Sequence, residues 1–198
     1  MIGIISYGAG NIRSVSNALH RLGASHFVSD DCKKLVQADK LIFPGVGEAR
    51  SAMEALAHTG LPDWLKDVTV PFLGICLGMQ LLFEHTTERA TDCLGVIGGT
   101  NTRFTSEKMV LKVPHMGWNQ VQHNSENPLF SEIISGENFY FVHSYYAPLV
   151  PSTIGMTEYG VQFTSALHQN NYYGVQFHPE KSGKAGLQLL KNFIDLCS

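Results

Sequence analysis

The chain has 198 residues, a length suited to one domain with one continuous core. Its residues are 44% hydrophobic and 16% charged, and the formal net charge of −3 gives no strong field to attract nucleic acid or an anionic membrane. No apolar run is as long as a membrane span, and the first residues lack a basic leader. We therefore expect a single cytoplasmic domain, residues 1–198, that binds neither nucleic acid nor membrane.

The cysteines and histidines show no metal-binding pattern. No two cysteines form a C-x-x-C pair, and none has zinc-finger spacing to a histidine. In a reducing cytoplasm the simplest expectation is free thiols, with no metal and no other cofactor. The four cysteines are Cys32, Cys76, Cys93 and Cys197.

Apolar runs alternate with helical patterns in the first half of the chain. Residues 2–6, 40–43 and 70–75 are rich enough in Ile, Leu, Phe and Val to be strands buried on both faces. Apolar residues spaced by three and four positions predict a helix after each of the first two strands. These residues are Ile12, Val15, Leu19 and Leu22 in the first helix, and Ala49, Met53, Leu56 and Ala57 in the second. This alternation is typical of a parallel sheet with helices on both sides.

The pattern changes after about Glu88. Short strand-like runs follow, punctuated by Gly, Asn, Pro and Ser, as in hairpins and meanders. They cover residues 102–104, 119–122, 139–142, 153–157, 161–167 and 172–176, and a helix at 184–196 closes the core. We expect one α/β domain, with a parallel half followed by an antiparallel half.

A possible nucleophile stands where the strand at 70–75 ends. Gly74-Ile75-Cys76-Leu77-Gly78 matches the G-x-nucleophile-x-G elbow, with a helical run predicted at 79–83. The two glycines leave room for a sharp turn, which exposes the thiol at a helix N-terminus, a position that favours thiolate. The N–H of Leu77 is then placed to bind an oxyanion. The alternative is that Cys76 is a buried core thiol, as free cysteines usually are.

A possible base follows the last predicted strand. In Phe177-His178-Pro179-Glu180, an extended backbone held by Pro179 would point His178 and Glu180 to the same side. The carboxylate could then fix the tautomer of the imidazole, which would activate a cysteine for acyl transfer. The alternative is a surface His and Glu beside a turn proline. Both motifs lie at the carboxyl ends of strands, where open α/β sheets place their sites.

Together these motifs resemble those of the class I (triad) glutamine amidotransferases. The resemblance rests on Gly74 to Gly78 with Gln80, on Phe177 to Glu180, and on Pro44-Gly45-Val46-Gly47, which is similar to the family's oxyanion loop. It covers the whole chain. It implies a single-domain, flavodoxin-like fold with a central mixed, mainly parallel sheet flanked by helices and an antiparallel second half. It also implies a Cys76, His178 and Glu180 triad.

A narrower resemblance is to the glutaminase subunits of imidazole glycerol phosphate synthases. It rests on residues 7–15, 114–119, 140–145 and 177–182. It implies that glutamine is hydrolysed to glutamate and ammonia through a Cys76 thioester. The ammonia would pass to a separate cyclase subunit with a (βα)8 barrel, which forms a heterodimer with this chain. That cyclase makes imidazole glycerol phosphate and aminoimidazole carboxamide ribonucleotide in histidine biosynthesis.

The resemblance also implies roles for further residues. The N–H of Leu77 and a backbone N–H from Gly45, Val46 or Gly47 would form the oxyanion hole. A peptide of this loop could turn its N–H away from the oxyanion when no partner is bound. The residues implied in holding the substrate are Gly47, Gln80, Glu88, Ser144 and Tyr145. Those implied at the partner interface are Asn11, Arg13, Met116, Trp118 and Lys181.

Other interpretations of these residues stay open at this point. Gly8-Ala9-Gly10 with Asp30 partly matches a dinucleotide fingerprint, although Arg13 occupies the third glycine position. Trp118 is predicted at a turn, as a core or an interface aromatic. Glu84 and Glu88 could form a solvated helix face, and His143 could be an ordinary strand histidine.

Three function classes remain as well. The leading hypothesis is a glutaminase that works with a synthase, either this one or another. The others are a stand-alone thiol hydrolase or peptidase, and a binding module with a vestigial site. No P-loop or convincing phosphate cradle is present in the sequence. The acceptor chemistry is therefore expected on another chain.

Overall fold

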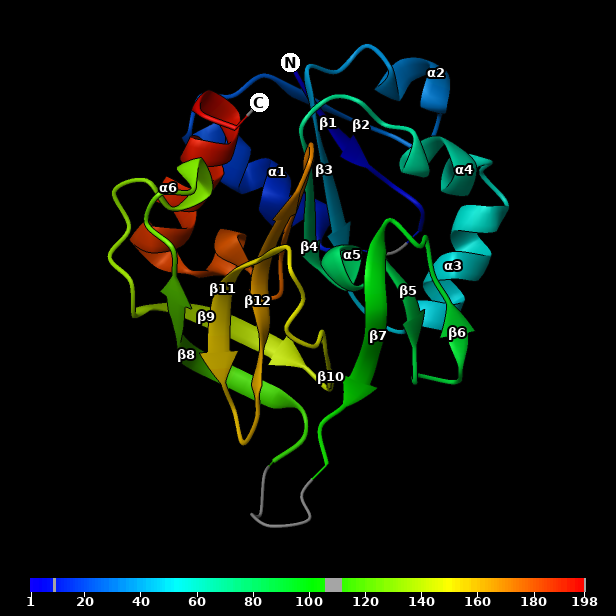
Figure 1. Cartoon of the computed structure of the whole chain (residues 1–198). Helices are drawn as coiled ribbons and strands as arrows, with labels where there is room; N and C mark the ends of the chain where they lie inside the picture. The colour runs from blue at the N-terminus through cyan, green and yellow to red at the C-terminus, as the bar shows by residue number, and fades with distance from the viewer. Residues whose placement is uncertain (9, 106–111, 198) are drawn as a thin grey trace.

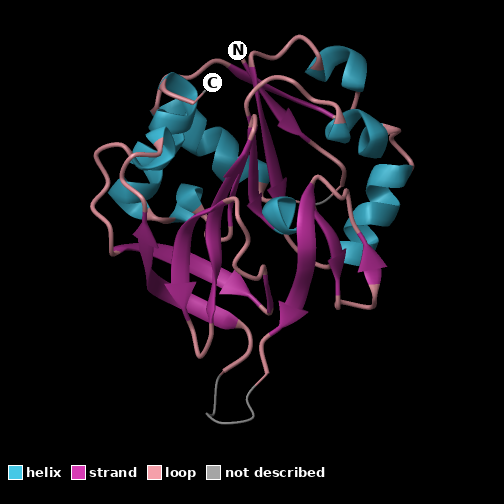
Figure 2. Ribbon diagram, viewed as in Figure 1, coloured by secondary structure: helices cyan, strands magenta, loops and turns pink. Residues whose placement is uncertain are grey.

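The computed structural model describes residues 1–8, 10–105 and 112–197 of the chain. Within this part, a nine-stranded sheet has the order β2-β1-β3-β4-β13-β12-β11-β8-β9, and helices cover both of its faces (Figures 1 and 2). The predicted α/β class is confirmed. None of the helices in the described ranges is long and apolar enough to cross a membrane.

The large sheet changes from parallel to antiparallel pairing at β13. The strands that pair in parallel are β2 (His26–Ser29), β1 (Ile2–Ile5), β3 (Lys40–Gly45), β4 (Phe72–Cys76) and β13 (Tyr172–Val175). The remaining strands pair antiparallel, and they are β12 (Gln162–Gln169), β11 (Thr153–Glu158), β8 (His115–His123) and β9 (Glu137–His143). The sheet is therefore mixed, and its parallel half consists of four early strands and the late strand β13.

A second, four-stranded sheet lies beside the large one and was not predicted from the sequence. Its order is β10 (Tyr145–Tyr146), β7 (Ile97–Arg103), β5 (Phe83–Thr86) and β6 (Thr91–Asp92). The helical run predicted at 79–83 is wrong in its second half, because α5 (Leu77–Gln80) is a single turn and Phe83 already begins β5. Glu84 and Glu88 consequently do not share a helix face.

The predicted strands β1, β3 and β4 are buried on both faces, whereas β2, which was not predicted and lies at the end of the sheet, is partly exposed. On one side lie α1 (Ile12–Arg21) and α6 (Gly183–Asp195), in one apolar cluster with Ile42 and Leu73. On the other side Leu41 and Phe72 belong to a second cluster. The helices that contribute to this second cluster include α2 (Cys32–Leu35), α3 (Ala49–Ala57), α4 (Leu61–Lys66) and α5. Adjacent residues of a strand point to opposite faces, so each strand contributes to both clusters.

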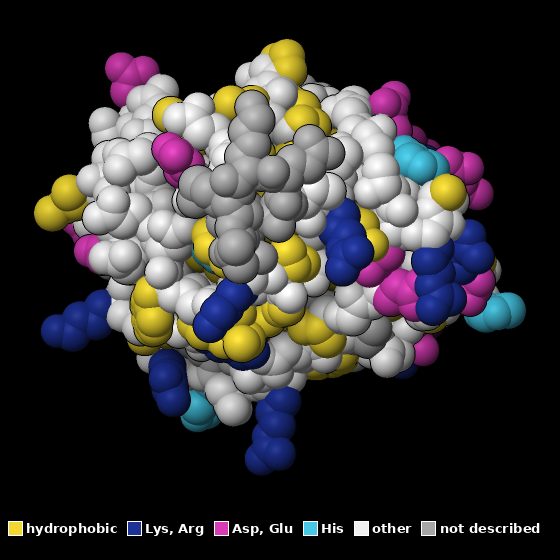
Figure 3. All heavy atoms as spheres, turned by 90° about the horizontal axis from the view of Figure 1, so that it is seen from below, with side chains coloured by type: hydrophobic (Ala, Val, Ile, Leu, Met, Phe, Trp, Pro, Cys, Tyr) yellow, Lys and Arg dark blue, Asp and Glu magenta, His cyan; other side chains and the backbone are white. Residues whose placement is uncertain are grey.

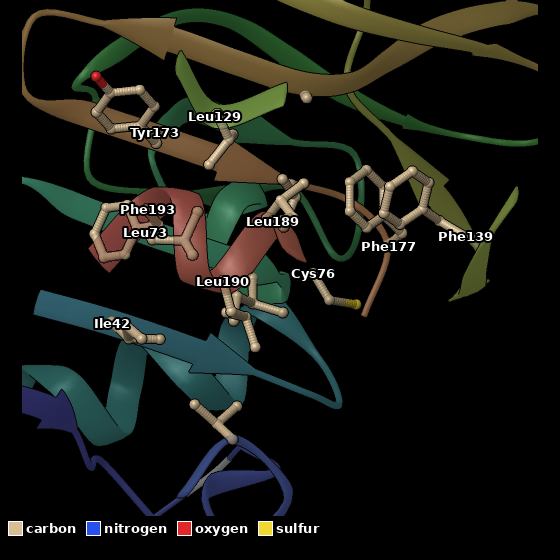
Figure 4. Packing of buried hydrophobic residues seen from close by; sticks show 14 of the residues in the cluster. Ile42, Leu73, Cys76, Leu129, Phe139, Tyr173, Phe177, Leu189, Leu190 and Phe193 are labelled. Atoms are coloured by element: carbon tan, nitrogen blue, oxygen red, sulfur yellow. The ribbon is translucent and has the colours of Figure 1, made fainter. Parts of the chain in front are cut away.

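The position of β13 brings the Cys76 motif and the His178 motif together. This late strand lies parallel to β4, with Gly174 opposite Gly74 and Val175 opposite Ile75. Their carboxyl ends therefore meet at one edge of the sheet, where Cys76 follows Ile75 and His178 comes shortly after Val175. Figure 4 shows Cys76 at the margin of the first cluster, with its sulfur pointing away from Leu189 and Leu190. Two short 3-10 helices complete the described structure, η1 (Pro128–Phe130) and η2 (Pro179–Lys181).

One further prediction, on Trp118, is wrong, and one predicted motif lies partly outside the described residues. Trp118 was predicted at a turn, but it lies in the middle of β8, opposite Tyr140 of β9. The pairing of β8 with β9 continues across Gly117 despite its φ of 130°, so the glycine does not end the strand. Ala9, part of the motif at 7–15, falls outside the described residues.

Candidate active site

The turn after β4 holds Cys76 in a backbone conformation that few residues other than glycine adopt, with φ 55° and ψ −112°. Close backbone packing accounts for the glycines around it. A Cβ on Gly78 would lie 1.9 Å from the carbonyl oxygen of Phe43, and one on Gly45 would lie 2.4 Å from the amide nitrogen of Gly78. Strand β3 and the elbow therefore touch through their backbones, which fixes the direction of the cysteine side chain.

The short helix after the elbow limits what its dipole contributes. With only four residues in α5, the aligned peptide dipoles are few. Leu77 is its first residue, so the N–H of Leu77 is among those that a helix leaves without an intrahelical partner. The elbow thus offers a backbone donor next to the sulfur, while most of the electrostatic support must come from other groups.

His178 and Glu180 form a buried pair. Nδ1 of His178 lies 2.8 Å from Oε1 of Glu180, and the two side chains are 2% and 1% exposed. The predicted contact is present, but the predicted extended backbone is wrong, because residues 179–181 form the 3-10 turn η2. Asn11 donates a longer bond of 3.4 Å to the same Oε1. Since Nδ1 faces the carboxylate, Nε2 is the nitrogen left for chemistry.

The turn that carries this pair is anchored to β9. The amide of His178 donates to the carbonyl oxygen of Tyr140 at 2.9 Å, and the amide of Tyr140 donates to Oγ of Ser182 at 2.9 Å. The Ser182 hydroxyl in turn donates to the carbonyl oxygen of His178 at 2.7 Å. This closed set of bonds holds the imidazole at the sheet edge where Cys76 also lies.

Charge around the imidazole favours its protonated form. Burial of the ring lowers the pKa of His178, but the Cys76 sulfur and the Glu180 carboxylate together outweigh burial and raise the pKa to about 10. At neutral pH the ring therefore carries protons on both nitrogens. A positively charged imidazole beside a cysteine can stabilise a thiolate and can later give a proton to a leaving amine.

A cleft of about 280 Å³ opens above the cysteine and collects most of the predicted site. The predicted residues that line it are Val46, Gly47, Cys76, Leu77, Gln80, Glu88, Ser144, Tyr145 and His178. Of the residues predicted for catalysis, the oxyanion hole and substrate binding, two do not line the cleft. Gly45 packs behind the elbow, and Glu180 lies behind the imidazole. The cleft is also lined by Pro114, Val142 and His143, which the sequence did not assign to the site.

Glu88 reaches the cleft from the turn after β5. Its Oε2 accepts a hydrogen bond of 2.8 Å from the amide of Ala49, at the start of α3. Burial raises the pKa of the Glu88 carboxyl, and the charge of Glu48 adds to this effect, while the Ala49 amide and Arg89 oppose it. A partly buried carboxylate in a cleft can bind an ammonium group.

The side-chain amide of Gln80 already donates both of its hydrogens to other groups of the protein. Its Nε2 donates to the carbonyl oxygen of Tyr145 at 2.7 Å and to Oε1 of Gln176 at 2.8 Å, which uses both amide hydrogens. Nε2 of Gln176 lies 3.8 Å from Sγ of Cys76. Sequence reasoning missed Gln176, although strand alternation from His178 could have placed it on the same side. These two amides link the sulfur to the far wall of the cleft.

Of the predicted interface residues, Asn11 and Lys181 lie next to Glu180, in space and in sequence respectively. Trp118 is 58% exposed, and its ring centroid lies 6.1 Å from that of Tyr140. The Nζ of Lys181 lies 5.9 Å from the centroid of the same Tyr140 ring. Lys181 directly follows Glu180 in the sequence. Met116 is 66% exposed on the same strand as Trp118, and Arg13 is exposed on α1. Figure 3 shows exposed apolar side chains gathered on the lower end of the molecule, with Lys and Arg among them.

Comparison with known proteins identifies the family. Residues 4–196 match the family model described as glutamine amidotransferase class-I. The chain belongs to this family. The match spans nearly the whole amidotransferase, and it includes both the elbow and the His178 motif.

Relatives of this amidotransferase carry a more specific name. The chain is 47% identical over 195 residues to the imidazole glycerol phosphate synthase subunit HisH of Bacteroides thetaiotaomicron, covering 98% of this chain and 99% of that protein. It is 46% identical to the subunit of the same name from Salmonella typhimurium, covering 98% of each. The HisH subunit of Pasteurella multocida is 44% identical, over 98% of this chain and 97% of that protein.

Solved structures support the fold of the amidotransferase. A putative GMP synthase subunit from Thermoplasma acidophilum superposes with a TM-score of 0.75 at 19% identity, covering 99% of this chain and 92% of that one. A PurLQS structure from Thermotoga maritima gives a TM-score of 0.69 at 19% identity, covering 100% of this chain and 98% of that one. At these identities the likeness concerns the fold alone.

Proposed function

We propose that this amidotransferase is the glutaminase subunit of an imidazole glycerol phosphate synthase, and that it hydrolyses glutamine to glutamate and ammonia. The observation that carries the proposal is the cleft that Cys76 and His178 both line, with the imidazole of His178 oriented by Glu180. The near full-length identity of 47% to a HisH subunit supports the choice of synthase.

In the proposed reaction, the Cys76 thiolate attacks the side-chain carboxamide carbon of glutamine. The new C–S bond forms as the carbonyl π-electrons move to oxygen, giving a tetrahedral oxyanion. His178 then gives its Nε2 proton to the nitrogen as the C–N bond breaks, and ammonia leaves. Water next attacks the glutamyl thioester and gives a proton to Nε2 of His178; the C–S bond then breaks, glutamate departs, and the Cys76 thiolate and protonated His178 are restored.

The oxyanion needs donors that face the cleft. We assign this role to the N–H of Leu77 and to a backbone N–H of the loop containing Val46 and Gly47. Leu77, Val46 and Gly47 line the cleft together with Cys76. Gly47 has a φ of 96°, so this loop uses a conformation that residues with side chains rarely adopt. A loop of this kind can turn one peptide without moving its ends, which would let the oxyanion hole open and close.

The other end of glutamine carries an ammonium and a carboxylate. We assign the Glu88 carboxylate to the ammonium, and the main chain of Ser144 and Tyr145 to the carboxylate, with Gln80 and Gly47 beside them. All of these residues line the cleft. The bonds from Gln80 to Tyr145 indicate that Gln80 acts by holding that main chain in place.

The ammonia acceptor would lie on another chain in the same cytoplasm. We propose that a (βα)8-barrel cyclase docks, as a heterodimer, on the surface formed by Asn11, Arg13, Met116, Trp118 and Lys181. Two large apolar side chains stand exposed there, which is typical of an interface. Asn11 and Lys181 also lie next to Glu180, in space and in sequence respectively, so docking occurs beside the triad. Short transfer of ammonia from the cleft is therefore feasible.

Active-site labelling tests the catalytic assignment. An electrophilic glutamine analogue, a chloroketone, should alkylate Cys76 once, as located by mass spectrometry, and excess glutamine should block the reaction. Cys76→Ala should abolish both labelling and glutamate release, whereas Cys93→Ala should retain both. Turnover of unrelated amides or esters with no preference for glutamine would instead indicate a general thiol hydrolase. Full glutamate release by Cys76→Ala would refute the mechanism.

A further inference from the structure

Two buried histidines outside the triad lie at one wall of the cleft: His143 is part of this wall, and His115 is hydrogen-bonded to it. His115 begins β8 and His143 ends β9, and the sheet register places them opposite each other. They are 3% and 6% exposed. His143 lines the cleft, and its Nδ1 lies 2.8 Å from the carbonyl oxygen of Tyr145. Neither ring has a part in the chemistry proposed above.

The hydrogen bonds fix which nitrogen of each ring carries a proton. A carbonyl oxygen can only accept, so Nδ1 of His143 donates to Tyr145. In a neutral ring Nε2 of His143 must then accept, and its partner is Nδ1 of His115 at 2.9 Å. Nε2 of His115 consequently accepts as well, from Nδ2 of Asn119 at 3.2 Å. In their neutral forms both rings are therefore protonated on Nδ1.

The orientation of the Asn119 amide is fixed independently by the backbone. Its Nδ2 also donates to the carbonyl oxygen of Glu158 at 3.0 Å. Its Oδ1 accepts from the amide of Gln120 at 2.8 Å. Turning the amide over would place two acceptors together and two donors together. The chain of donors therefore has one direction, from Asn119 through both rings to Tyr145.

The surroundings keep the two rings uncharged. The His115 ring stacks between Tyr159 and Phe141, with centroid distances of 4.1 Å and 4.9 Å. Burial lowers the pKa of His115 to about 4. Burial likewise lowers the pKa of His143 to about 3, aided by His115 and His178 and opposed by the bond to Tyr145. A proton added to either ring would also set two donors against each other.

The end point of this chain of donors is the substrate wall of the cleft. The Tyr145 carbonyl oxygen receives two hydrogen bonds, one from Nδ1 of His143 and one from Nε2 of Gln80 at 2.7 Å. The carbonyl oxygen of Ser144 accepts from the amide of Phe104 at 3.0 Å. Both carbonyl groups are thereby held, which fixes the orientation of the two peptide groups that contain them, at the wall that Ser144 and Tyr145 form.

We propose that His143, paired with His115, is a positioning residue for glutamine binding. Its Nδ1–H holds the Ser144 and Tyr145 main chain in the conformation that receives the substrate's carboxylate. This inference rests on the proposed glutaminase function. Because the carboxylate is distant from the bond that breaks, its contacts are the same in the ground state and the transition state. Loss of the His143 bond therefore raises KM for glutamine and leaves kcat unchanged.

Two substitutions separate the two ring nitrogens. The side-chain amide of His143→Asn can donate from near the Nδ1 position, whereas the amide of His143→Gln lies near Nε2 and cannot reach Tyr145 in the same way. We expect His143→Gln to raise KM about tenfold, the size expected for one lost hydrogen bond, with kcat within about twofold of the wild type. His143→Asn should recover most of the KM. His123→Gln, in β8 but outside the cleft, should leave both constants unchanged.

A measurement on the unaltered protein covers the case in which a variant fails to fold. The ring nitrogen chemical shifts of 15N-histidine-labelled protein at pH 7 should show His115 and His143 as neutral Nδ1–H tautomers. An Nε2–H tautomer or a charged ring at either position would overturn the inference. The inference would also be overturned if the wild type is active and the folded His143→Gln variant has the same KM for glutamine. A wild type that releases no glutamate under any condition would instead refute the proposed function.

Discussion

Gly78→Ala tests how the elbow is held. A Cβ at this position would lie 1.9 Å from the carbonyl oxygen of Phe43, whereas real Cβ atoms essentially never come closer than 3.0 Å to a neighbour. The added Cβ is fixed directly to the backbone of the elbow, and the oxygen belongs to the backbone of β3, so no flexible side chain can move to relieve the clash. The strand and the elbow must separate by about 1 Å or more.

The cost of this separation follows from packing. Overfilling a close-packed core costs about 1–3 kcal/mol, and a backbone clash belongs at the upper end, near 3 kcal/mol. A displacement of about 1 Å at the nucleophile costs a further hundredfold in rate. We therefore expect Gly78→Ala to lower the free energy of unfolding by about 3 kcal/mol and to lower kcat about a hundredfold in the molecules that remain folded.

The assay pairs urea unfolding with glutamate release, normalised to the folded fraction. Gly98→Ala is the matched control, because Gly98 lies in β7 with nothing within 4 Å of its added Cβ and no positive φ. This control should change the free energy of unfolding by less than about 0.5 kcal/mol and leave kcat unchanged. A Gly78→Ala protein with wild-type stability and rate would refute the reasoning.

Three further predictions concern the charged groups of the site. Glu180→Gln should lower kcat by about 10²–10⁴ with little change in KM, as measured by steady-state kinetics, because the His178 tautomer is no longer fixed; a rate within twofold of the wild type would contradict this. Because the pKa of His178 in the free protein is raised to about 10, the protonated acid persists at neutral pH, and kcat/KM should fall only as pH rises through about 10; a fall of kcat/KM complete by pH 8 would contradict it. Because burial raises the pKa of Glu88, KM for glutamine should increase on acidification at a higher pH than for an ordinary carboxyl, and Glu88→Gln should have a high KM without this acidic increase; equal profiles for variant and wild type would exclude Glu88 as the ammonium ligand.

The sequence predicted which edge of the sheet carries the Cys76 and His178 motifs, because the signals for these motifs are local. The elbow at Cys76 combines an apolar strand with glycines at fixed spacing, and the His178 motif follows another strand. The rule that strands of open α/β sheets carry sites at their carboxyl ends then brought the two motifs together, although about 100 residues separate them. In the structure, β13 pairs in parallel with β4, so the carboxyl ends of these two strands lie side by side.

The second sheet could not be predicted in the same way. The run Leu81-Leu82-Phe83 is apolar without interruption, and such a run does not distinguish a helix from a strand. In the structure Phe83 pairs with Ile97 of β7, so tertiary contacts decide the outcome. The strand at Trp118 is a similar case, because pairing with β9 overrides the turn signal of Gly117.

The paired histidines lie beyond what sequence patterns reveal. His115 and His143 are 28 positions apart, and only the register of β8 against β9 places them in contact. The direction of their hydrogen bonds depends in turn on the backbone partners of Asn119 and on the Tyr145 carbonyl group. Such a network becomes visible only when donors and acceptors are assigned atom by atom.

Glutamate release from glutamine by the pure chain, alone and then with the candidate cyclase and its ribonucleotide, tests the central claim most directly. We expect slow release by the chain alone and a large increase with partner and ribonucleotide, lost in Cys76→Ala. Full release by the chain alone, unchanged by either addition, would contradict the assignment to this synthase. It would leave Cys76 as the catalyst of a different amidotransferase or of an independent hydrolase.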